Sequence, residues 1–156
     1  MARSIFADLT VDDIHDLTTC PTTRLTTRAA AVLWLERTIA PTWGAVMVDL
    51  DGLKRVNDAA GHDAGDALLR LAAEVVRCTV RHDDVLVVRW GGDELLVLAP
   101  GAASVTPILD RLTLALDGRL AVRASVGGAV AERVADAITA ADLGMMATKS
   151  ARRIQR

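Results

Sequence analysis

The segment Val85-Leu-Val-Val-Arg-Trp-Gly-Gly-Asp-Glu-Leu-Leu-Val-Leu98 is the part of this chain from which the fold can be worked out. Val85 to Trp90 and Leu95 to Leu98 are apolar runs with the composition of β-strands. Gly91-Gly92-Asp93-Glu94 lies between them and predicts a hairpin turn. The two runs are therefore expected to form neighbouring antiparallel strands, with two acidic residues at the turn.

Further strand-like and helix-like segments lie on both sides of this hairpin. Ala45 to Leu50 is a short apolar run that contains Asp49 and precedes Asp51, and it predicts a buried strand ending in acidic residues. Leu120 to Val126 alternates in polarity and predicts another strand. Apolar residues three or four positions apart predict helices. These helices are expected from about Arg24 to Ile39, with Val32, Leu35 and Ile39 on one face and Ala-Pro-Thr at 40–42 as the end; from Ala64 to about Val80, with Asp63 able to cap it; from Val105 to Leu116; and in a last segment marked by Val134, Ile138, Ala141 and Met145.

The order of these segments predicts the fold class. Strand, helix, strand, strand, helix, strand, with extra helices at both ends, is the ferredoxin-like or palm-type βαββαβ plan, an α+β fold with a mainly antiparallel sheet. A chain of 156 residues, of which 51% are hydrophobic and 24% charged, can bury one core without disulfide or metal support. We expect one domain over residues 16–156, preceded by a short lead at residues 1–15.

Charge and composition exclude several classes of function. The formal net charge of −2 argues against a protein that binds DNA or RNA mainly through its phosphates. The N-terminus lacks the pattern of a secretory signal, and no stretch approaches the roughly 18 uninterrupted apolar residues of a membrane span. Cys20 and Cys78 match no metal-binding or redox spacing. We therefore expect a cytoplasmic protein that has reduced cysteines and does not bind a membrane.

Two groups of acidic residues are expected to meet in this fold. Asp49 and Asp51 lie at the end of the first strand of the core, and Asp93 and Glu94 occupy the hairpin turn. The first strand is central in such a sheet and can lie beside the hairpin. Carboxylates held close together repel one another, and a divalent cation with oxygen ligands relieves the repulsion. Mg²⁺ is the natural candidate, and two such ions suit a displacement at phosphorus.

The stretch between Asp49 and Asp66 has the composition of a nucleotide-binding loop. It is polar, contains several glycines and directly follows a buried strand. The backbone amides around Gly52 and Leu53 can face a phosphate, as in other glycine-containing loops. A solvent-exposed hairpin with no ligand remains the alternative interpretation of the Gly-Gly-Asp-Glu turn.

Taken together, these motifs resemble those of the GGDEF domain family, the diguanylate cyclases that make cyclic di-GMP from two GTP molecules. The motif that names the family is present as Arg89-Trp-Gly-Gly-Asp-Glu-Leu95, with leucine in place of the usual phenylalanine. Resemblance extends over about residues 16–153 and includes several motifs in the right order. The other matching segments are Asp49-Leu-Asp-Gly-Leu-Lys54, Asn57-Asp58, Gly61-His-Asp63, Gly65-Asp66, Ser125-Val-Gly127, Ala141-Asp142, Lys149 and Arg153.

The resemblance implies a role for each matching position. Mg²⁺, or alternatively Mn²⁺, would be held by Asp49, the carbonyl of Leu50, Asp93 and Glu94, and Asp93 or Glu94 would help to deprotonate the attacking 3′-hydroxyl. The guanine edge would be bound by Asn57 and Asp66, because a carboxylate accepts hydrogen bonds from guanine nitrogens. The positions expected to contact the phosphates or to let the nucleotide approach the backbone are Leu53, Lys54, Gly91, Gly92, Lys149 and Arg153.

The function implied is a bacterial signalling enzyme that condenses two GTP into cyclic di-GMP and pyrophosphate. Each domain holds one GTP, so turnover requires a homodimer. One alternative is a catalytically weak domain that binds GTP, cyclic di-GMP or a partner protein as a sensor. Another is a palm-like cyclase that makes a different cyclic nucleotide, although Asp66 argues against adenine.

Several of these residues also have a purely structural interpretation. Asn57 and Asp66 can cap or brace the loop and the helix that follows it. Lys149 and Arg153 can be the cations that are favourable near a helix C-terminus. His62 is expected to take part in hydrogen bonding of the loop and not to bind a ligand.

The sequence also departs from the family pattern. The opening motif, Asp16-Leu-Thr-Thr-Cys-Pro-Thr-Thr-Arg24, lacks the usual glycine and asparagine. Arg81 and Asp84 have the internal spacing of the family's product-inhibition site, but six residues instead of five separate Asp84 from Gly91. One extra residue in a strand turns side chains to the other face unless a bulge absorbs it, so both outcomes stay open. The lead before Asp16 is too short for a sensor, and dimerisation would then depend on the domain itself, on Val11 to Leu17 or on a separate sensor or effector protein.

Overall fold

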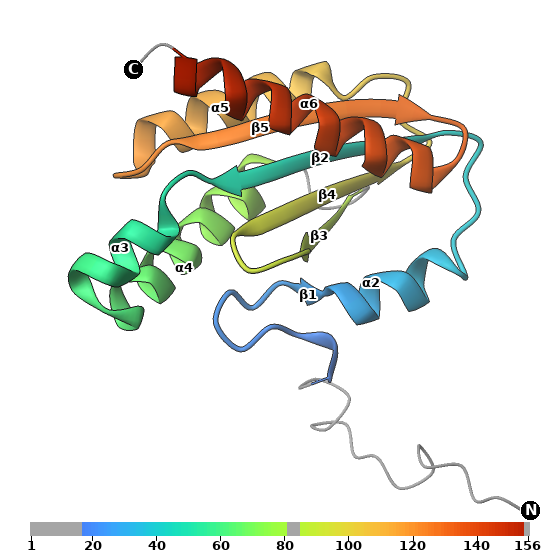
Figure 1. Cartoon of the computed structure of the whole chain (residues 1–156). Coiled ribbons are helices and arrows are strands. Elements are labelled where there is room, and N and C mark those ends of the chain that lie inside the picture. Colours follow the sequence, from blue (N-terminus) through green and yellow to red (C-terminus); the bar gives the residue numbers. More distant parts are fainter. Residues whose placement is uncertain (1–16, 81–84, 155–156) are drawn as a thin grey trace, which may run out of the picture.

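A five-stranded sheet in the order β1-β3-β4-β2-β5 forms the centre of the fold (Figure 1). The structure is a computed structural model, and it describes residues 17–80 and 85–154, without the side chains of 153 and 154. The elements are β1 (Thr26–Thr27), α2 (Arg28–Leu35), β2 (Trp43–Leu50), α3 (Leu53–Ala60), α4 (His62–Thr79), β3 (Leu86–Arg89), β4 (Glu94–Pro100), α5 (Thr106–Arg119), β5 (Ala124–Ala131) and α6 (Val134–Ile154).

The predicted α+β class with a βαββαβ core is confirmed. The core elements follow one another as β2, α4, β3, β4, α5 and β5. Strand β2 lies between β4 and β5 and is antiparallel to both, and β3 and β4 form the predicted hairpin. The short strand β1 adds a parallel edge beside β3.

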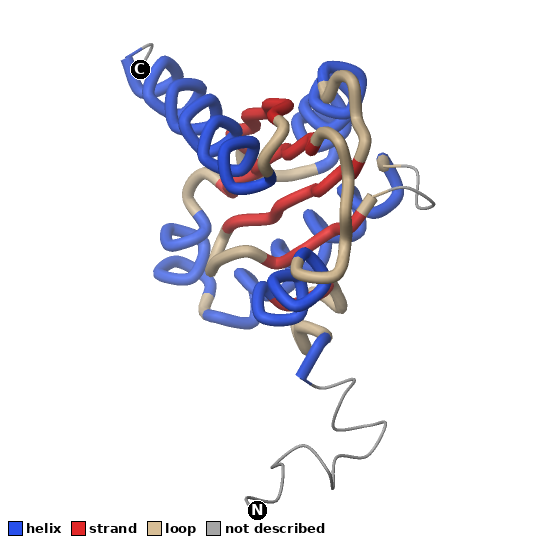
Figure 2. Tube along the Cα trace, turned by 90° about the vertical axis from the view of Figure 1, so that its right-hand side faces the viewer, coloured by secondary structure: helices blue, strands red, loops and turns tan. Residues whose placement is uncertain are grey.

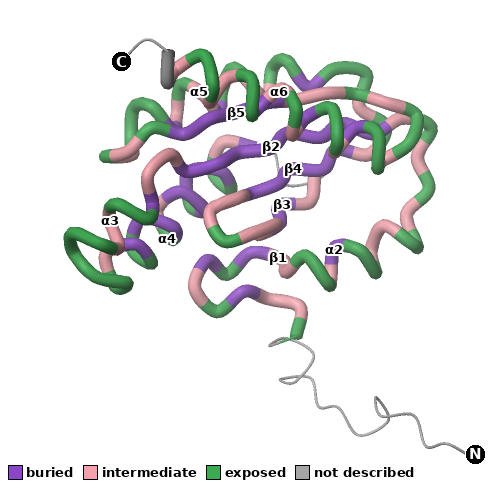
Figure 3. The backbone as a smooth tube through the Cα atoms, viewed as in Figure 1, coloured by how far each residue is buried: buried purple, intermediate pink, exposed green. Residues whose placement is uncertain are grey.

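Helices cover the sheet on both faces, which explains the apolar sequence of β2. Val46, Val48 and Leu50 pack in one cluster with residues of α4 and α5. Ala45 and Met47 belong to a second cluster, to which α2 and α6 contribute. Figure 2 shows α5 and α6 on opposite sides of the strands, and Figure 3 shows that β2 is buried along its whole length. A strand buried on both faces is apolar at every position except where function or pairing requires otherwise.

The first predicted helix is wrong in its length, and of the three residues predicted to share one face only Leu35 packs against the core. Residues 26–27 form β1, and the Thr27 hydroxyl accepts a hydrogen bond from the Ala30 amide, so α2 begins only after this cap. The helix ends at Leu35, before the Ala-Pro-Thr sequence. Val32 is 44% exposed and Ile39 is 99% exposed, whereas Ala31 is buried against the sheet. Ala31 is the fully buried residue of this helix, which its modest hydrophobicity did not indicate.

Other element boundaries also need correction. Residues 53–60, predicted only as a polar stretch, form α3, whose exposed side accounts for its polarity. Gly61, and not Asp63, is the N-cap of α4, and Asp63 lies in the first turn. Strand β5 begins at Ala124 instead of Leu120 and continues through two glycines to Ala131. Helix α5 extends to Arg119.

Helix α6 packs across β5 and β2 and is the longest helix of the described chain. Its predicted apolar face is confirmed, since Ala141 and Met145 are buried in the core cluster and Val134 and Ile138 pack against it. Ala137, which was not predicted, is buried in the same cluster. The Thr148 hydroxyl donates a hydrogen bond to the Val126 carbonyl at 3.2 Å, which ties the helix to β5. Among the described helices, none has the length and apolar character needed to cross a lipid bilayer.

Gly127 allows α6 to lie directly against β5. A Cβ atom at this position would stand 2.0 Å from the Met145 amide nitrogen and 2.4 Å from the Ala141 carbonyl oxygen. Backbone atoms of a packed helix cannot move aside as a flexible side chain does. The contact between β5 and α6 therefore requires glycine here.

The substitution Gly127→Ala is expected to lower the free energy of unfolding by roughly 2–3 kcal/mol, the range typical of overpacked sites. Urea denaturation followed by circular dichroism measures this loss. Gly118→Ala is the matched control, because Gly118 lies in α5 with open space around it. It should leave the stability unchanged or raise it by up to about 1 kcal/mol. Equal stability of the two variants would contradict the packing argument.

Candidate functional site

The end of β2 and the hairpin turn place the acidic residues side by side. Asp49 is the register partner of Glu94 on β4 and of Ser125 on β5. The backbone of the turn is joined to the strand end, because the Leu50 amide donates a hydrogen bond to the Asp93 carbonyl at 3.1 Å. The register confirms the predicted approach for Asp49 and Glu94.

Arg89 holds the glycine turn in place. Its Nε donates to the Gly91 carbonyl at 3.4 Å and its Nη2 donates to the Gly92 carbonyl at 2.8 Å. Its third nitrogen, Nη1, donates to Cys20 Sγ at 3.2 Å. A Cβ on Gly91 would stand 2.5 Å from Glu94 Oε2, whereas one on Gly92 would meet open space. Gly91 therefore makes room for the carboxylate of Glu94, while Gly92 leaves the outer side of the turn open.

Cys20 stands where the opening motif of the family has glycine, and it supports Arg89. Burial by itself raises the pKa of the thiol, but hydrogen bonds involving Thr23, Arg89 and the backbone at Thr22 and Thr23 outweigh that effect and lower the pKa from 9.0 to about 7. Cys20 and Cys78 are both free cysteines, as predicted. The altered motif thus keeps a structural connection to the glycine turn.

Lys149, at the C-terminal end of α6, reaches the buried acid of β2. Its Nζ donates to Asp49 Oδ1 at 2.6 Å and lies 3.9 Å from Asp51 Oδ1. Asp49 is only 5% exposed, so the carboxylate of this ion pair is shielded from bulk water. The resemblance places Lys149 on the triphosphate, and in this structure the same ammonium neutralises the acid that is expected to bind metal.

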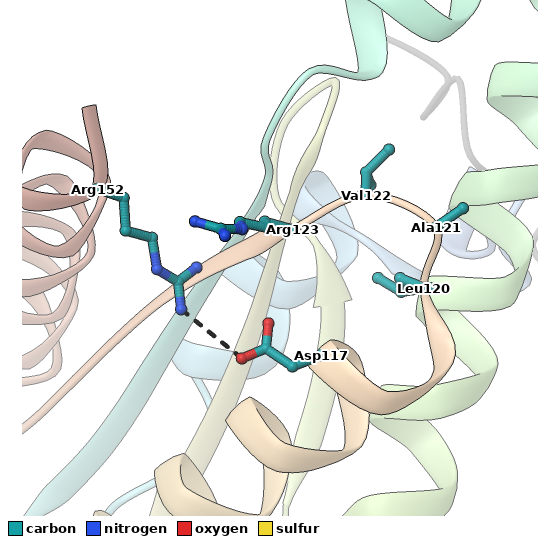
Figure 4. Close-up of a pocket in the computed structure, with 6 residues that line it drawn as sticks. All are labelled: Asp117, Leu120, Ala121, Val122, Arg123 and Arg152. Carbon is teal, nitrogen blue, oxygen red and sulfur yellow. Dashed lines mark ion pairs between the residues drawn. The ribbon is translucent and has the colours of Figure 1, made fainter. Parts of the chain in front are cut away.

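Asp51 has a different set of partners. The Ser125 hydroxyl donates to Asp51 Oδ2 at 2.8 Å, and Arg152 Nη1 lies 3.9 Å from the same oxygen. Arg152 also donates to the Ala124 carbonyl, and its Nη2 lies 3.8 Å from Asp117 Oδ2 (Figure 4). Sequence reasoning missed Arg152 and Ser125 in this network. The only signal was the basic composition at the end of α6, which does not indicate a partner.

Burial and mutual repulsion shift the pKa values at the site. The pKa of Asp49 is raised mainly by burial, and the charges of Asp93 and Asp51 add to the effect, while the hydrogen bond from Lys149 opposes it. The pKa of Glu94 is also raised by burial and then by the charges of Asp93, Asp49 and Asp142. Both acids therefore give up their protons less readily than solvated carboxylates do.

The net result for Lys149 is the reverse of what burial alone would do. Burial lowers the pKa of the ammonium, but the hydrogen bond to Asp49 and the charges of Asp49, Asp51 and Asp93 outweigh it, so that the pKa is raised. Lys149 is held firmly in its charged form.

Helix α3 begins at the predicted phosphate-facing segment. Gly52 is its N-cap with φ of 94° and ψ of 18°, a left-handed conformation that favours glycine. The first amides of a helix have no acceptor within the helix, so those of Leu53 and its neighbours are available to an anion. Leu53 itself is buried, whereas Lys54 is exposed in the first turn.

Asn57 and Asp66, the predicted guanine-binding pair, lie on α3 and α4. Asn57 Oδ1 is buried and has no hydrogen-bond partner among the residues that the structure describes. It lies against Gly65, where a Cβ would stand 1.8 Å from Oδ1. The Asp66 side chain is exposed, one residue beyond that glycine. An unsatisfied buried oxygen is unfavourable, and a ligand that donates a hydrogen bond would correct it.

One cavity shares Arg152 with the partners of Asp51, and another is lined in part by Glu94. The first, of about 360 Å³, is lined by Asp117, Leu120, Ala121, Val122, Arg123 and Arg152 (Figure 4). The second, of about 260 Å³, is lined by Arg28, Met47, Trp90, Glu94, Ile138, Thr139 and Asp142. The Arg28 guanidinium lies 4.4 Å from the centre of the Trp90 ring, which indicates a cation–π contact. Asp142, which sequence reasoning assigned no role, thus shares a cavity with Glu94.

Some predicted residues fall outside the described part of the chain. Arg81 and Asp84, the two residues of the proposed inhibitory site, lie within 81–84, and residues 1–16 contain the lead before Leu17. Arg153 belongs to the last turn of α6, but its side chain is also outside the described residues. The structure therefore leaves these three side chains and the lead as predictions.

The donor atoms at the site have the chemistry that Mg²⁺ requires. The carboxylates of Asp49, Asp93 and Glu94 and the carbonyl of Leu50 are oxygen ligands of the kind that Mg²⁺ and Mn²⁺ prefer. Over residues 17–80 and 85–154, no three acidic, histidine or cysteine side chains converge as a ready metal site. The ligand atoms are therefore of the chemical type that Mg²⁺ binds. One of the expected ligands, the Asp49 carboxylate, accepts a hydrogen bond from Lys149 Nζ in this structure.

Comparison with known proteins agrees with the fold and with the motifs. The family model described as “Diguanylate cyclase, GGDEF domain” matches residues 15–155. The cyclic di-GMP phosphodiesterase NbdA of Pseudomonas aeruginosa is 45% identical in an alignment of 93 residues that covers 53% of this chain and 12% of that protein. The diguanylate cyclase DgcM of Escherichia coli is 36% identical over 91 residues, which are 58% of this chain and 21% of that protein.

Solved structures give the same result. The coiled coil and GGDEF domain of DgcB from Caulobacter crescentus, in complex with c-di-GMP, superposes with a TM-score of 0.81 at 25% identity. The superposition covers 90% of this chain and 84% of that one. The chain spans less than a quarter of the length of the two curated relatives above, so the likeness concerns this domain alone. Because the family model matches nearly the whole sequence, the chain belongs to the GGDEF domain family.

Proposed function

We propose that this domain is a diguanylate cyclase that condenses two GTP molecules into cyclic di-GMP and releases two pyrophosphates. The observation that carries the proposal is the register of Asp49 opposite Glu94, directly beside the open glycine turn. Family membership and the relative named as a diguanylate cyclase support it. In the reaction each 3′-oxygen attacks the α-phosphorus of the other GTP, a new ester bond forms, and pyrophosphate leaves.

Glu94, or Asp93 beside it, would accept the proton from the attacking hydroxyl. Burial and the neighbouring charges raise the pKa of Glu94, which makes it a stronger base than a solvated carboxylate. Asp49, the carbonyl of Leu50, Asp93 and Glu94 would hold Mg²⁺ or Mn²⁺. When bound, the metal would neutralise charge on the phosphates and on the attacking oxygen.

The phosphates would lie between the start of α3 and the end of α6. The amide of Leu53 and the ammonium of Lys54 lie at the N-terminus of α3, where anions are favoured. Lys149 and Arg153, one helical turn apart, would bind the triphosphate from the other side. Positive charge at these positions would stabilise the charge that develops during phosphoryl transfer.

Guanine would bind between α3 and α4. Asn57 Oδ1 would accept a hydrogen bond from the base, which satisfies its buried oxygen. The carboxylate of Asp66 would accept from the N1 and N2 hydrogens of guanine, which adenine does not present in that arrangement.

A second candidate function is binding without efficient turnover. The relative NbdA is named as a cyclic di-GMP phosphodiesterase, and the alignment with this chain covers 12% of its length. Similar domains therefore occur in proteins that are named for another activity. The altered opening motif and the Lys149–Asp49 ion pair are also consistent with a domain that binds GTP or cyclic di-GMP as a sensor.

Incubation of the purified protein with GTP and Mg²⁺ at several protein concentrations tests the two candidates. A cyclase that works as a homodimer will produce cyclic di-GMP at a rate that rises faster than linearly with protein concentration. Chromatography with mass detection identifies the product. Absence of product at every concentration, together with retention of GTP or cyclic di-GMP, would replace the enzyme proposal by the sensor.

Glu94→Gln is expected to lower the rate of product formation by at least about 100-fold, the scale of general base catalysis. The same variant should also be more stable at pH 7–8 without divalent cations, because it removes a buried charge from a repulsive cluster. Its free energy of unfolding, measured by urea denaturation, should rise by about 1 kcal/mol. The raised pKa means that the native state binds the Glu94 proton more tightly than the unfolded state. The gain is therefore full above that pKa and shrinks as the pH falls through it.

Glu74→Gln, on the exposed side of α4, is the matched control and should change neither the rate nor the stability. Full activity of Glu94→Gln would remove Glu94 from the proposed chemistry. A stability gain that persists at acidic pH would contradict the electrostatic explanation.

Asp66→Ala is expected to weaken GTP binding by about 10-fold or more and to reduce discrimination against ATP, because one paired contact to the base is lost. Asp63→Ala is the control, since Asp63 is equally exposed in the first turn of the same helix. Titration calorimetry with non-hydrolysable GTP and ATP analogues measures both affinities. Equal effects of the two substitutions would show that only helix charge is involved.

A further inference from the structure

We propose that Lys149 is the resident counter-cation of Asp49 in the metal-free domain and exchanges with the divalent metal at that carboxylate. In this exchange the ammonium leaves Asp49 when a divalent cation binds there, and it then becomes available to an anionic substrate group. The proposal rests on the proposed function for the identity of that substrate. It assigns Lys149 a positioning role, in which it prepares Asp49 and responds to the occupancy of that carboxylate.

Asp49 on β2 and Asp51 just after it differ in how far they depend on Lys149. Asp49 is 5% exposed, and Lys149 is the cation that contacts it in the described chain. Asp51 accepts a hydrogen bond from Ser125 and also faces Arg152, so it keeps a partner when Lys149 leaves. Removal of Lys149 therefore leaves Asp49 alone as an uncompensated buried charge, which is costly unless another cation replaces it.

Lys149 and a metal ion would compete for the same carboxylate. Nζ lies 2.6 Å from Asp49 Oδ1, and Mg²⁺ would lie about 2.0–2.1 Å from a ligand oxygen, so the two cations would stand close together on one nearly buried carboxylate and repel one another. The remaining expected ligands, Asp93 and Glu94, belong to the hairpin and do not contact Lys149 through an ion pair in the described chain. The competition thus concerns Asp49 specifically.

The position of Lys149 also allows it to leave. Its side chain is 28% exposed, whereas that of Asp49 is 7% exposed, so the ammonium has a path to solvent and the carboxylate does not. Lys149 lies near the end of α6, on a flexible four-carbon side chain. The carboxylate stays in place on the central strand while the cation changes.

Chemical acetylation of the unmodified protein tests the exchange directly. Lys54 and Lys149 are the only lysines of the chain, and Lys54 is exposed, so it serves as an internal reference. Brief treatment with an acetylating reagent, followed by mass spectrometry, gives the ratio of modification at the two sites. Addition of Mg²⁺ without nucleotide should increase the reactivity of Lys149 severalfold relative to Lys54.

In Asp49→Asn, Lys149 should already be reactive and should not respond to Mg²⁺. A Lys149 reactivity that is unchanged by Mg²⁺ in the unmodified protein, at concentrations where binding is saturated, would overturn the proposal. So would an equal response of Lys149 and Lys54, because it would reflect a general effect of the salt.

Direct metal binding provides the second measurement. Mn²⁺ is titrated at pH 8 without nucleotide, and free Mn²⁺ is followed by electron paramagnetic resonance. Lys149→Met should bind Mn²⁺ about tenfold more tightly than the unmodified protein, which corresponds to about 1.4 kcal/mol. Arg77→Met, which removes one positive charge from an exposed position in the last turn of α4, should leave the affinity unchanged.

Equal or weaker Mn²⁺ binding by Lys149→Met, in a variant that circular dichroism shows to be folded, would overturn the exchange. Neither measurement uses GTP, so the result is separate from the proposed function. A domain that makes no cyclic di-GMP while Lys149 responds to Mg²⁺ would retain the exchange and lose the cyclase activity. Formation of cyclic di-GMP while Lys149 does not respond to Mg²⁺ would retain the cyclase activity and overturn the exchange.

Discussion

Hydrogen bonding of β2 on both sides, to β4 and to β5, is the constraint on which the site depends. The antiparallel register with β4 places Asp49 opposite Glu94, and the register with β5 places it opposite Ser125. A shift of one residue in either pairing would turn these side chains to the other face of the sheet. Because the hydrophobic residues of β2 pack in clusters on both faces, such a shift would also expose or misplace the core. The packing of the core and the geometry of the acids are therefore secured by the same register.

The electrostatic arrangement follows from this burial. A carboxylate that is fixed on a central strand cannot move to solvent, so the surrounding chain must supply a cation or raise the pKa of the acid. Both occur here, since Lys149 contacts Asp49 and the pKa of Asp49 remains raised. The arginine and serine beside Asp51 solve the same problem in another way, with contacts that do not depend on Lys149. This difference separates an acid that is available to exchange its cation from one that stabilises the structure.

Several features could be predicted because they depend on local sequence. The Gly-Gly turn with apolar runs on both sides predicts the hairpin, and the acids at its tip predict where charge accumulates. The start of α3 was predicted as a phosphate-facing segment but not as a helix, because its buried side is short and most of its residues are polar. In the first helix Leu35 packs against the core as predicted, but the fully buried residue is Ala31, whereas the larger Val32 is exposed. Burial there depends on the space between α2 and the sheet, which the hydrophobic pattern does not contain.

The amino-acid sequence by itself determined the order of strands and helices, the positions of the candidate acids and the family to which the domain belongs. These properties follow from periodicity, turn chemistry and motifs, all of which act over a few residues. Only the tertiary structure decided that Lys149 pairs with Asp49, that Arg152 and Ser125 hold Asp51, and that Gly127 must be small. Such contacts join residues far apart in the chain, and they form because β5 and α6 pack against β2 at one particular depth and angle.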